Sequence, residues 1–294
     1  MTFLQTVDAP IVSTFLPRST GAKGLEVGPV GPDYGQVNGI EKPIGPSNFV
    51  KWYRDEGNAP DGEKIPTDLR NYGSAFGLLS IGCTATHIGN GLVLSAGHCF
   101  MEFGGDPLDN ATCGDDVTVR FGYLYRKYVR TARTPAAVSD PRESSCTKIV
   151  RAEFSDGVDY AIFEVDNPPT VAVPVDATAR PKIGTQVTVV GHPSGRPLEW
   201  SMYCATASTS VLPWDPRDVP SRFAHQCDTQ PVSSGSPVIQ MSPLAVIGIH
   251  NGGKITDKQG AQDWGWNFGT YLADTGLTKI LTNAASSVQP APPP

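Results

Sequence analysis

One histidine, one aspartate and one serine lie in short sequence contexts that suit a nucleophilic mechanism. His98 lies in SAGHC, Asp159 opens DYAIFEV, and Ser234 lies in SSGSP. A serine hydroxyl is a weak nucleophile at neutral pH, so it needs a base to take its proton and a third group to hold that base in the right tautomer. An imidazole suits the role of base because its unperturbed pKa of about 6.5 lets it accept and return a proton near neutrality. The three residues therefore predict attack of a serine hydroxyl on a carbonyl carbon.

Two of these three residues have competitors close by in the sequence. Asp159 is preferred because it directly precedes a buried β run, where a carboxylate can lie at the inner edge of a sheet and face a cleft. Ser234 is preferred because, within its cluster, it alone has glycine directly after it, which leaves room for a substrate backbone. The competing residues are Asp156, Asp166, Ser233 and Ser236.

Short strands must position these residues. From about residue 75, apolar runs such as VTVRFGYL, TQVTVVG and AVIGIH alternate with Gly, Asn, Asp or Pro, which is typical of an antiparallel barrel or sandwich. Near the end, LADTGLTKILTN can form a short helix with Leu277, Ile280 and Leu281 on one face. The sequence therefore predicts an all-β fold with a short C-terminal helix.

The composition excludes several classes of function. Charged residues make up 18% of the 294 residues, while Gly (31) and Pro (27) are abundant, which suits a loop-rich β protein. The net charge of −6 provides no basic surface, so no nucleic-acid partner is expected. The weakly charged stretch 76–100 is interrupted by Gly, Ser, Thr and His, so no membrane insertion is expected either.

The six cysteines indicate disulfides rather than a metal site. None lies in a C-x-x-C pair and the chain has no H-E-x-x-H motif, so no metal is expected. Paired disulfides imply an oxidising compartment, and a secreted or extracellular protein is therefore expected. Residues 1–20 carry no recognisable signal peptide.

The composition divides the chain into three parts. Residues 1–74 are rich in Gly and Pro and show no sustained period, so they are expected to form an N-terminal extension. This extension is either a flexible or surface-hugging segment, or a propeptide that covers the cleft. Residues 75–283 carry the strand pattern, and residues 284–294 read as a Pro-rich tail or linker.

Four segments together resemble a known family. SAGHC, DYAI, DTQPVSSGSPV and AVIGIHNGG, in that order, are similar to the catalytic boxes of trypsin-fold, S1-type serine endopeptidases, most of all the secreted bacterial glutamyl and lysyl endopeptidases. The resemblance implies two six-stranded antiparallel β-barrels around a cleft, the first at about 75–175 and the second at about 176–283. It also implies hydrolysis of a polypeptide substrate with no metal or organic cofactor. A monomer is expected.

The same resemblance implies the disulfide pairing. The segment GHPSGRPLEWS is also similar to the lysyl endopeptidase-like enzymes. The implied pairs are Cys83–Cys99, Cys113–Cys146 and Cys204–Cys227.

The chain departs from the family pattern beside the nucleophile. The backbone N–H groups of Val232 and Ser234 are the expected oxyanion-hole donors, but the family has glycine at the first of these positions. A β-branched residue resists a positive φ and could hold the peptide flipped, and loss of one donor costs about 10²–10³ in rate. Either the enzyme is weak or latent, or the local backbone accommodates valine. Ser233 replaces the aspartate that trypsin-like zymogens carry, so activation through a new N-terminal amine at that position is not expected.

Two signals for substrate specificity conflict. Asp228 lies six residues before Ser234, where a carboxylate selects Lys or Arg at P1. Thr229 and His250 instead match the Thr and His that hold an acidic P1 side chain in the resembled glutamyl endopeptidases. The acidic preference is favoured, with a basic preference as the alternative.

The remaining pocket residues follow His250. Gly252 and Gly253 are expected to flank the substrate backbone and pair with it as an added strand. Asp263 is a further carboxylate that could reach the pocket. The expected pocket is Asp228, Thr229, His250, Asn251, Gly252 and Gly253.

Two other functions stay open. A pseudoprotease that binds a peptide or partner without turnover is motivated by Val232. An esterase-like hydrolase is disfavoured because the chain lacks a G-x-S-x-G elbow and an α/β pattern.

Overall fold

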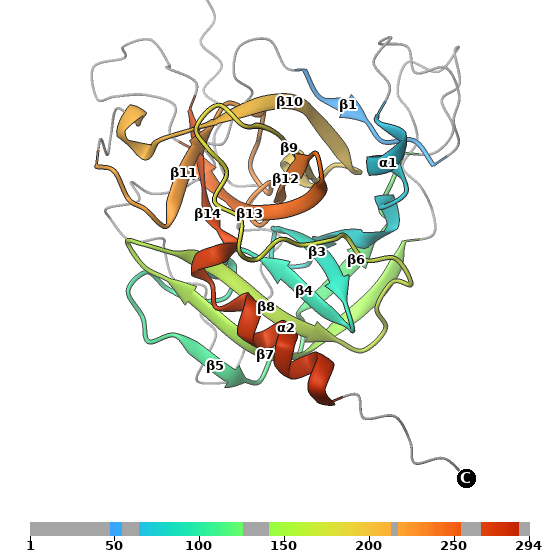
Figure 1. Cartoon of the computed structure of the whole chain (residues 1–294). Coiled ribbons are helices and arrows are strands. Elements are labelled where there is room, and N and C mark those ends of the chain that lie inside the picture. Colours follow the sequence, from blue (N-terminus) through green and yellow to red (C-terminus); the bar gives the residue numbers. More distant parts are fainter. Residues whose placement is uncertain (1–47, 55–64, 126–140, 213–216, 254–265, 288–294) are drawn as a thin grey trace, which may run out of the picture.

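The structure is a computed structural model that describes residues 48–54, 65–125, 141–212, 217–253 and 266–287. Within these ranges the chain folds into two stacked β-barrels (Figure 1). Each barrel consists of six strands that close on themselves, and one further strand pairs at the outside of each. The predicted all-β fold with two six-stranded antiparallel barrels and a short C-terminal helix is confirmed.

The first barrel follows the order β7-β6-β2-β3-β4-β8 and closes through pairing of β7 with β8. Strand β5 (Leu108–Ala111) adds to the outer side of β7. The six barrel strands are β2 (Phe76–Leu79), β3 (Thr84–Gly89), β4 (Leu92–Ser95), β6 (Thr118–Phe121), β7 (Arg142–Phe154) and β8 (Asp159–Val165).

The second barrel follows the order β10-β11-β14-β13-β12-β9 and closes through pairing of β10 with β9. Strand β1 (Val50–Lys51) adds to β10. The six barrel strands are β9 (Gln186–Gly191), β10 (Glu199–Ala207), β11 (Arg222–His225), β12 (Pro237–Met241), β13 (Leu244–Gly253) and β14 (Asn267–Tyr271).

The hairpin of β3 and β4 shows how local sequence sets the register. Gly89, Asn90 and Gly91 have φ values of 109°, 53° and 74°, a left-handed turn that glycine and asparagine tolerate. The turn returns β4 along β3, and β4 then pairs antiparallel with β8 with Ser95 opposite Ala161. The end of β4 therefore lies beside the start of β8.

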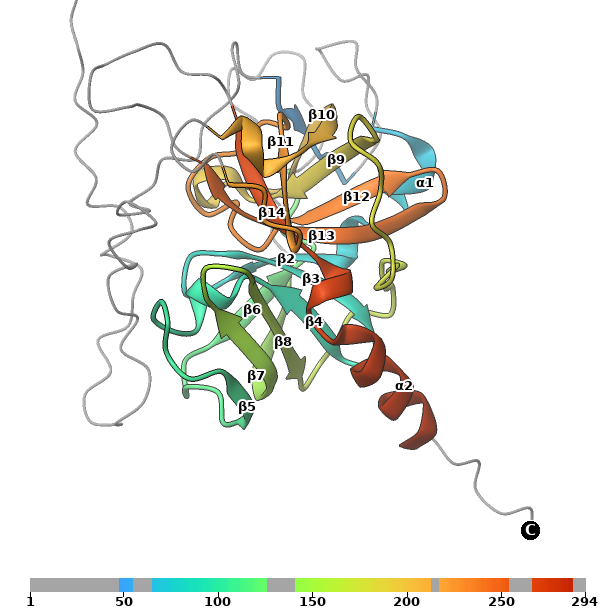
Figure 2. The same ribbon diagram turned by 60° about the vertical axis from the view of Figure 1, so that its left-hand side comes forward.

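One apolar cluster continues across both barrels. Phe76 and Phe163 of the first barrel share it with Trp200 and Ile249 of the second. Leu277 of α2 (Leu277–Ser287) is fully buried in the same cluster, which joins the C-terminal helix to the barrels (Figure 2). The contact between the barrels is therefore stabilised by the same burial of apolar surface that stabilises each barrel.

Part of the Gly/Pro-rich N-terminal region packs on the barrels. Residues Val50–Lys51 form β1, and Trp52 behind them is 2% exposed. Leu69 of α1 (Thr67–Arg70) is also fully buried in the main cluster. These residues belong to the packed unit although their sequence carries no strand periodicity.

Disulfides and short turns complete the described structure. The disulfides link Cys83 with Cys99, Cys113 with Cys146 and Cys204 with Cys227, the pairs that the resemblance implied. No helix in the described ranges is long and apolar enough to cross a membrane. The 3-10 turns are η2 (Gly73–Ala75), η3 (Gly97–Cys99), η4 (Pro193–Gly195), η5 (Thr209–Val211) and η6 (Leu272–Asp274).

Candidate active site

His98 and Asp159 meet where β4 ends and β8 begins. His98 lies in η3, directly after β4, and Asp159 is the first residue of β8. The imidazole Nδ1 lies 2.7 Å from Asp159 Oδ2, and the His98 backbone N–H donates to Oδ1 at 3.0 Å. Because an ionised carboxylate only accepts hydrogen bonds, Nδ1 carries the proton and Nε2 is left as the basic nitrogen. Asp159 is thereby held at two points.

Ser234 lies at the junction of the barrels, in the loop before β12. Its carbonyl accepts a hydrogen bond from the backbone N–H of Thr84, the first residue of β3. Its hydroxyl donates to the carbonyl of Asn251 at 3.3 Å, and the Asn251 amide donates to the carbonyl of Asp159 at 2.7 Å. One asparagine therefore connects the serine to the aspartate. Ser234 is 6% exposed and the His98 side chain 12%.

Asn251 is itself fixed by a residue that the sequence did not single out. The Thr270 hydroxyl donates to Asn251 Oδ1 at 2.8 Å and accepts from the Asp159 backbone N–H at 3.0 Å. Thr270 lies on β14, beside β13, so only strand pairing in the second barrel brings it to Asp159. No sequence motif marks it.

Gly235 is needed for a reason other than the one expected from sequence. Its φ is +85°, and a Cβ there would lie 2.3 Å from both the Thr84 carbonyl oxygen and Ser95 Oγ. The close approach is between the serine loop and the first barrel rather than between the loop and a substrate. Glycine therefore allows Ser234 to lie against the strand that leads to His98.

Val232 adopts the left-handed backbone conformation that glycine would take. Its φ is +78°. This conformation costs a non-glycine residue about 1–3 kcal/mol and persists only where its surroundings enforce it. Its carbonyl accepts from Thr84 Oγ1 at 3.0 Å, and the preceding Pro231 carbonyl accepts from the Ser194 N–H at 2.5 Å. The backbone thus accommodates valine, at the cost of strain.

Thr229 and His250 are fully buried on the second-barrel side. Within the described residues, the Thr229 hydroxyl has no hydrogen-bond partner. His250 Nδ1 lies 3.1 Å from Nε2 of His225, so the two buried rings are in direct polar contact. Burial, with the charge of His250 as a second cause, holds the pKa of His225 well below its ordinary value. His225 was not predicted, and no motif signals it.

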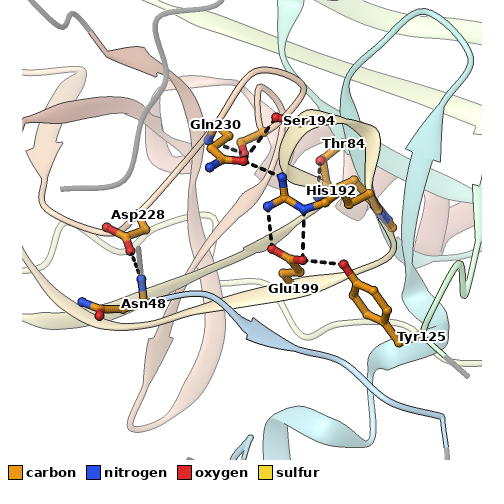
Figure 3. Close-up of polar contacts among 10 residues, drawn as sticks. Asn48, Thr84, Tyr125, His192, Ser194, Glu199, Asp228 and Gln230 are labelled. Carbon is orange, nitrogen blue, oxygen red and sulfur yellow. Dashed lines mark hydrogen bonds and ion pairs between the residues drawn. The ribbon is translucent and has the colours of Figure 1, made fainter. Parts of the chain in front are cut away.

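Asp228 is buried and bonded to the N-terminal segment. It is 4% exposed, and its Oδ2 accepts from the backbone N–H of Asn48 at 2.7 Å (Figure 3). These two residues are 180 positions apart in the chain. Asp263, the other carboxylate considered for the pocket, lies outside the described residues.

Gly252 and Gly253 extend β13 past Asn251. They pair with Phe268 and Asn267 of β14, after a bulge that begins at His250. A Cβ on Gly253 would lie 2.0 Å from Asn267 Oδ1, so this edge approaches its neighbour closely.

Two groups of metal-ligating residue types occur in the described part of the chain. They are Cys83, His98 and Cys99, and Cys204, His225 and Cys227. In both groups the two cysteine sulfurs are bonded to each other, so they do not present thiolates to a metal.

Two closed barrels with a carboxylate-bound histidine beside a serine loop define a chymotrypsin-like arrangement. The chain belongs to the trypsin-like peptidase domain family, whose pattern matches residues 83–249. The chain is also similar to crystal structures of the protease Rv3671c from M. tuberculosis H37Rv. The inactive form gives 20% identity over 72% of this chain and 91% of that chain, with a TM-score of 0.44. An inactive serine-to-alanine mutant gives 18% identity over 77% and 93%, with the same TM-score of 0.44. Among curated proteins, no sequence matches this chain.

Proposed function

We propose that this protein is a secreted serine endopeptidase that uses His98, Asp159 and Ser234. The observation that carries the proposal is the 2.7 Å contact between His98 Nδ1 and Asp159, at the junction where Ser234 lies directly before Gly235. The three disulfides are compatible with an oxidising, extracellular compartment.

In the proposed mechanism, His98 Nε2 takes the hydroxyl proton of Ser234 as the serine oxygen attacks the peptide carbonyl. The carbonyl oxygen becomes an oxyanion, and the Asp159 carboxylate stabilises the imidazolium that forms. The imidazolium then protonates the leaving amine, which departs and leaves an acyl-enzyme. A water molecule repeats the sequence and releases the acid.

The backbone N–H groups of Val232 and Ser234 are proposed to bind the oxyanion. The φ of +78° at Val232 supports this assignment, because it is the conformation that glycine supplies in the family. It also weighs against the pseudoprotease, whose motivation was that valine would keep the peptide flipped.

Among P1 side chains, we favour an acidic one, which places the protein with glutamyl rather than lysyl endopeptidases. The buried Thr229 hydroxyl has no hydrogen-bond partner within the described chain, so it is suited to bind a carboxylate. His250 is proposed as the second group that binds this carboxylate, by resemblance to the Thr and His of the glutamyl endopeptidases.

The alternative, a basic P1 side chain, depends on Asp228. Its Oδ2 is already bonded to the Asn48 N–H, which makes it less suited to bind lysine or arginine. Removing the Asn48 contact would revive this alternative.

We also propose that the peptidase unit includes residues 48–74. Trp52 and Leu69 are buried in the shared core, so cleavage after residue 74 would remove apolar surface from the folded unit. Any propeptide is therefore proposed to end before Asn48.

The test is labelling by a fluorophosphonate probe, which reacts with an activated serine. Labelling is expected in the wild type, lost in Ser234→Ala and retained in the matched control Ser236→Ala. No labelling of the wild type, before or after limited proteolysis ahead of Asn48, would overturn the proposal. A P1-scanning peptide library then ranks Glu and Asp against Lys and Arg.

A further inference from the structure

Two residues with a positive φ lie at the contact between η4 and the candidate oxyanion loop. Val232 has φ +78° and Ser194, in η4, has φ +53°. The Ser194 N–H donates to the carbonyl of Pro231 at 2.5 Å. In a trans peptide the carbonyl and the following N–H point in opposite directions, so this bond also fixes the direction of the Val232 N–H.

The η4 loop is in turn attached to the serine loop through side chains. Ser194 Oγ and Arg196 both donate to the amide oxygen of Gln230, at 3.2 Å and 2.7 Å (Figure 3). Gln230 also bonds within its own loop, with its N–H donating to Ser233 Oγ at 3.0 Å. Gln230 is therefore the point at which the two loops are joined.

Arg196 is held by a buried carboxylate. Its Nε and one terminal nitrogen donate to the two oxygens of Glu199, at 3.1 Å and 2.8 Å. Glu199 is 2% exposed and also accepts from the hydroxyl of Tyr125 at 2.6 Å. A planar guanidinium bound at both carboxylate oxygens has little rotational freedom, so its remaining nitrogen is directed at Gln230.

The contacts draw on both barrels and on the N-terminal segment. Tyr125 follows β6 of the first barrel, whereas Glu199 begins β10 of the second. Lys51 of β1 pairs with Glu199, and the Arg196 guanidinium lies 5.9 Å from the Phe49 ring. The position of Arg196 is therefore set by three parts of the chain.

We propose that Arg196 is a positioning residue that, through Gln230 and the η4 loop, holds the Pro231–Val232 peptide in the orientation that directs the Val232 N–H to the oxyanion. This proposal rests on the proposed function, because it assigns a role within the same site. Its physical basis is particular to this chain. Glycine at 232 would adopt the positive φ freely, whereas valine needs an external restraint.

The kinetic test compares Arg196→Met, Val232→Gly and the double variant, with Arg142→Met as a matched control on β7. Arg196→Met is expected to lower kcat by about 10²-fold, as for loss of one oxyanion donor, with little change in KM. A peptide trifluoromethyl ketone, whose hemiketal oxygen occupies the oxyanion hole, should lose affinity in parallel, whereas a product peptide should not. The double variant is expected to recover most of the activity, because glycine removes the need for the restraint.

Two results would overturn the proposal: wild-type kcat in Arg196→Met, or a double variant as slow as Arg196→Met. A crystal structure of Arg196→Met supplies a readout that needs no activity. The φ of residue 232 is expected to become negative, with loss of the bond from Ser194 to Pro231. A retained positive φ at residue 232 would refute the positioning role even if the wild type cleaves peptides. An inactive wild type, together with the expected change of φ in Arg196→Met, would refute only the proposed function.

Discussion

The buried histidine His192 makes a specific prediction for stability against pH. It is fully buried and its ring stacks with Tyr123, with the ring centroids 5.9 Å apart. Nδ1 lies 2.9 Å from the carbonyl of Arg196, so the neutral ring donates Nδ1–H there. Nε2 has no partner within the described residues, and a proton on it would be buried without a hydrogen bond. Burial lowers the pKa of His192 from 6.5 to about 4.

The sign and size of the effect follow from proton linkage. Above pH 6.5 both the folded and the unfolded states hold a neutral His192, and the residue contributes no pH dependence. As the pH falls from 6.5 towards 4, only the unfolded state binds the proton, so the free energy of unfolding decreases. At about 1.36 kcal/mol per pKa unit, the loss is about 2 kcal/mol at pH 5 and approaches about 3 kcal/mol near pH 4. His87 and His225, whose pKa values burial also lowers, act in the same direction.

The assay is urea unfolding at pH 7, 6 and 5, for the wild type and for His192→Asn. The variant loses packing, so its absolute stability falls, but the comparison concerns the slope against pH. The variant should lose about 2 kcal/mol less than the wild type between pH 7 and pH 5. Equal slopes would refute the assignment of a neutral buried ring. Gln240→Ala, a change at a half-buried position on β12, serves as the control for the slope.

Three further predictions concern the site and its supports. Asp159→Asn should lower kcat about 10⁴-fold with unchanged thermal unfolding, because the amide turns the imidazole to the wrong tautomer. If the rate of labelling by the fluorophosphonate probe falls less than tenfold, the triad is refuted. Thr229→Val should lower kcat/KM for a P1 glutamate peptide about 10-fold or more, since a hydrogen bond to a charged group is lost. A matched peptide with glutamine at P1 should be much less affected. Removal of residues 1–54 should abolish labelling and lower the midpoint of thermal unfolding, because β1 and the buried Trp52 are lost. Cleavage before Asn48 should preserve the labelling and the midpoint. Equal behaviour of the two truncated proteins would contradict the proposed boundary.

In the serine loop, contacts from distant parts of the chain add to what the local sequence predicts. Gly235 was expected to admit a substrate, but its space is taken by Thr84 and Ser95 of the first barrel. Val232 was expected to resist a positive φ, and the strain is present, yet neighbouring contacts hold the residue there. In both cases local propensity is read correctly from the sequence, and a contact from a distant part of the chain determines the outcome.

The sequence by itself determined the strands and an antiparallel β fold, while its resemblance to a known family predicted the two barrels and the roles of His98, Asp159 and Ser234. Alternation, turn residues and short motifs are local properties, so they can be read without knowledge of which segments meet. Only the tertiary structure decided that the Asn48 N–H donates to Asp228 and that His225 contacts His250. It alone also showed that Arg196 donates to Gln230, while Tyr125 donates to the carboxylate of Glu199 that holds Arg196. These contacts join residues up to 180 positions apart, and only the folded chain brings them together. No local pattern encodes such a pairing, because its free energy arises only when both partners are buried together.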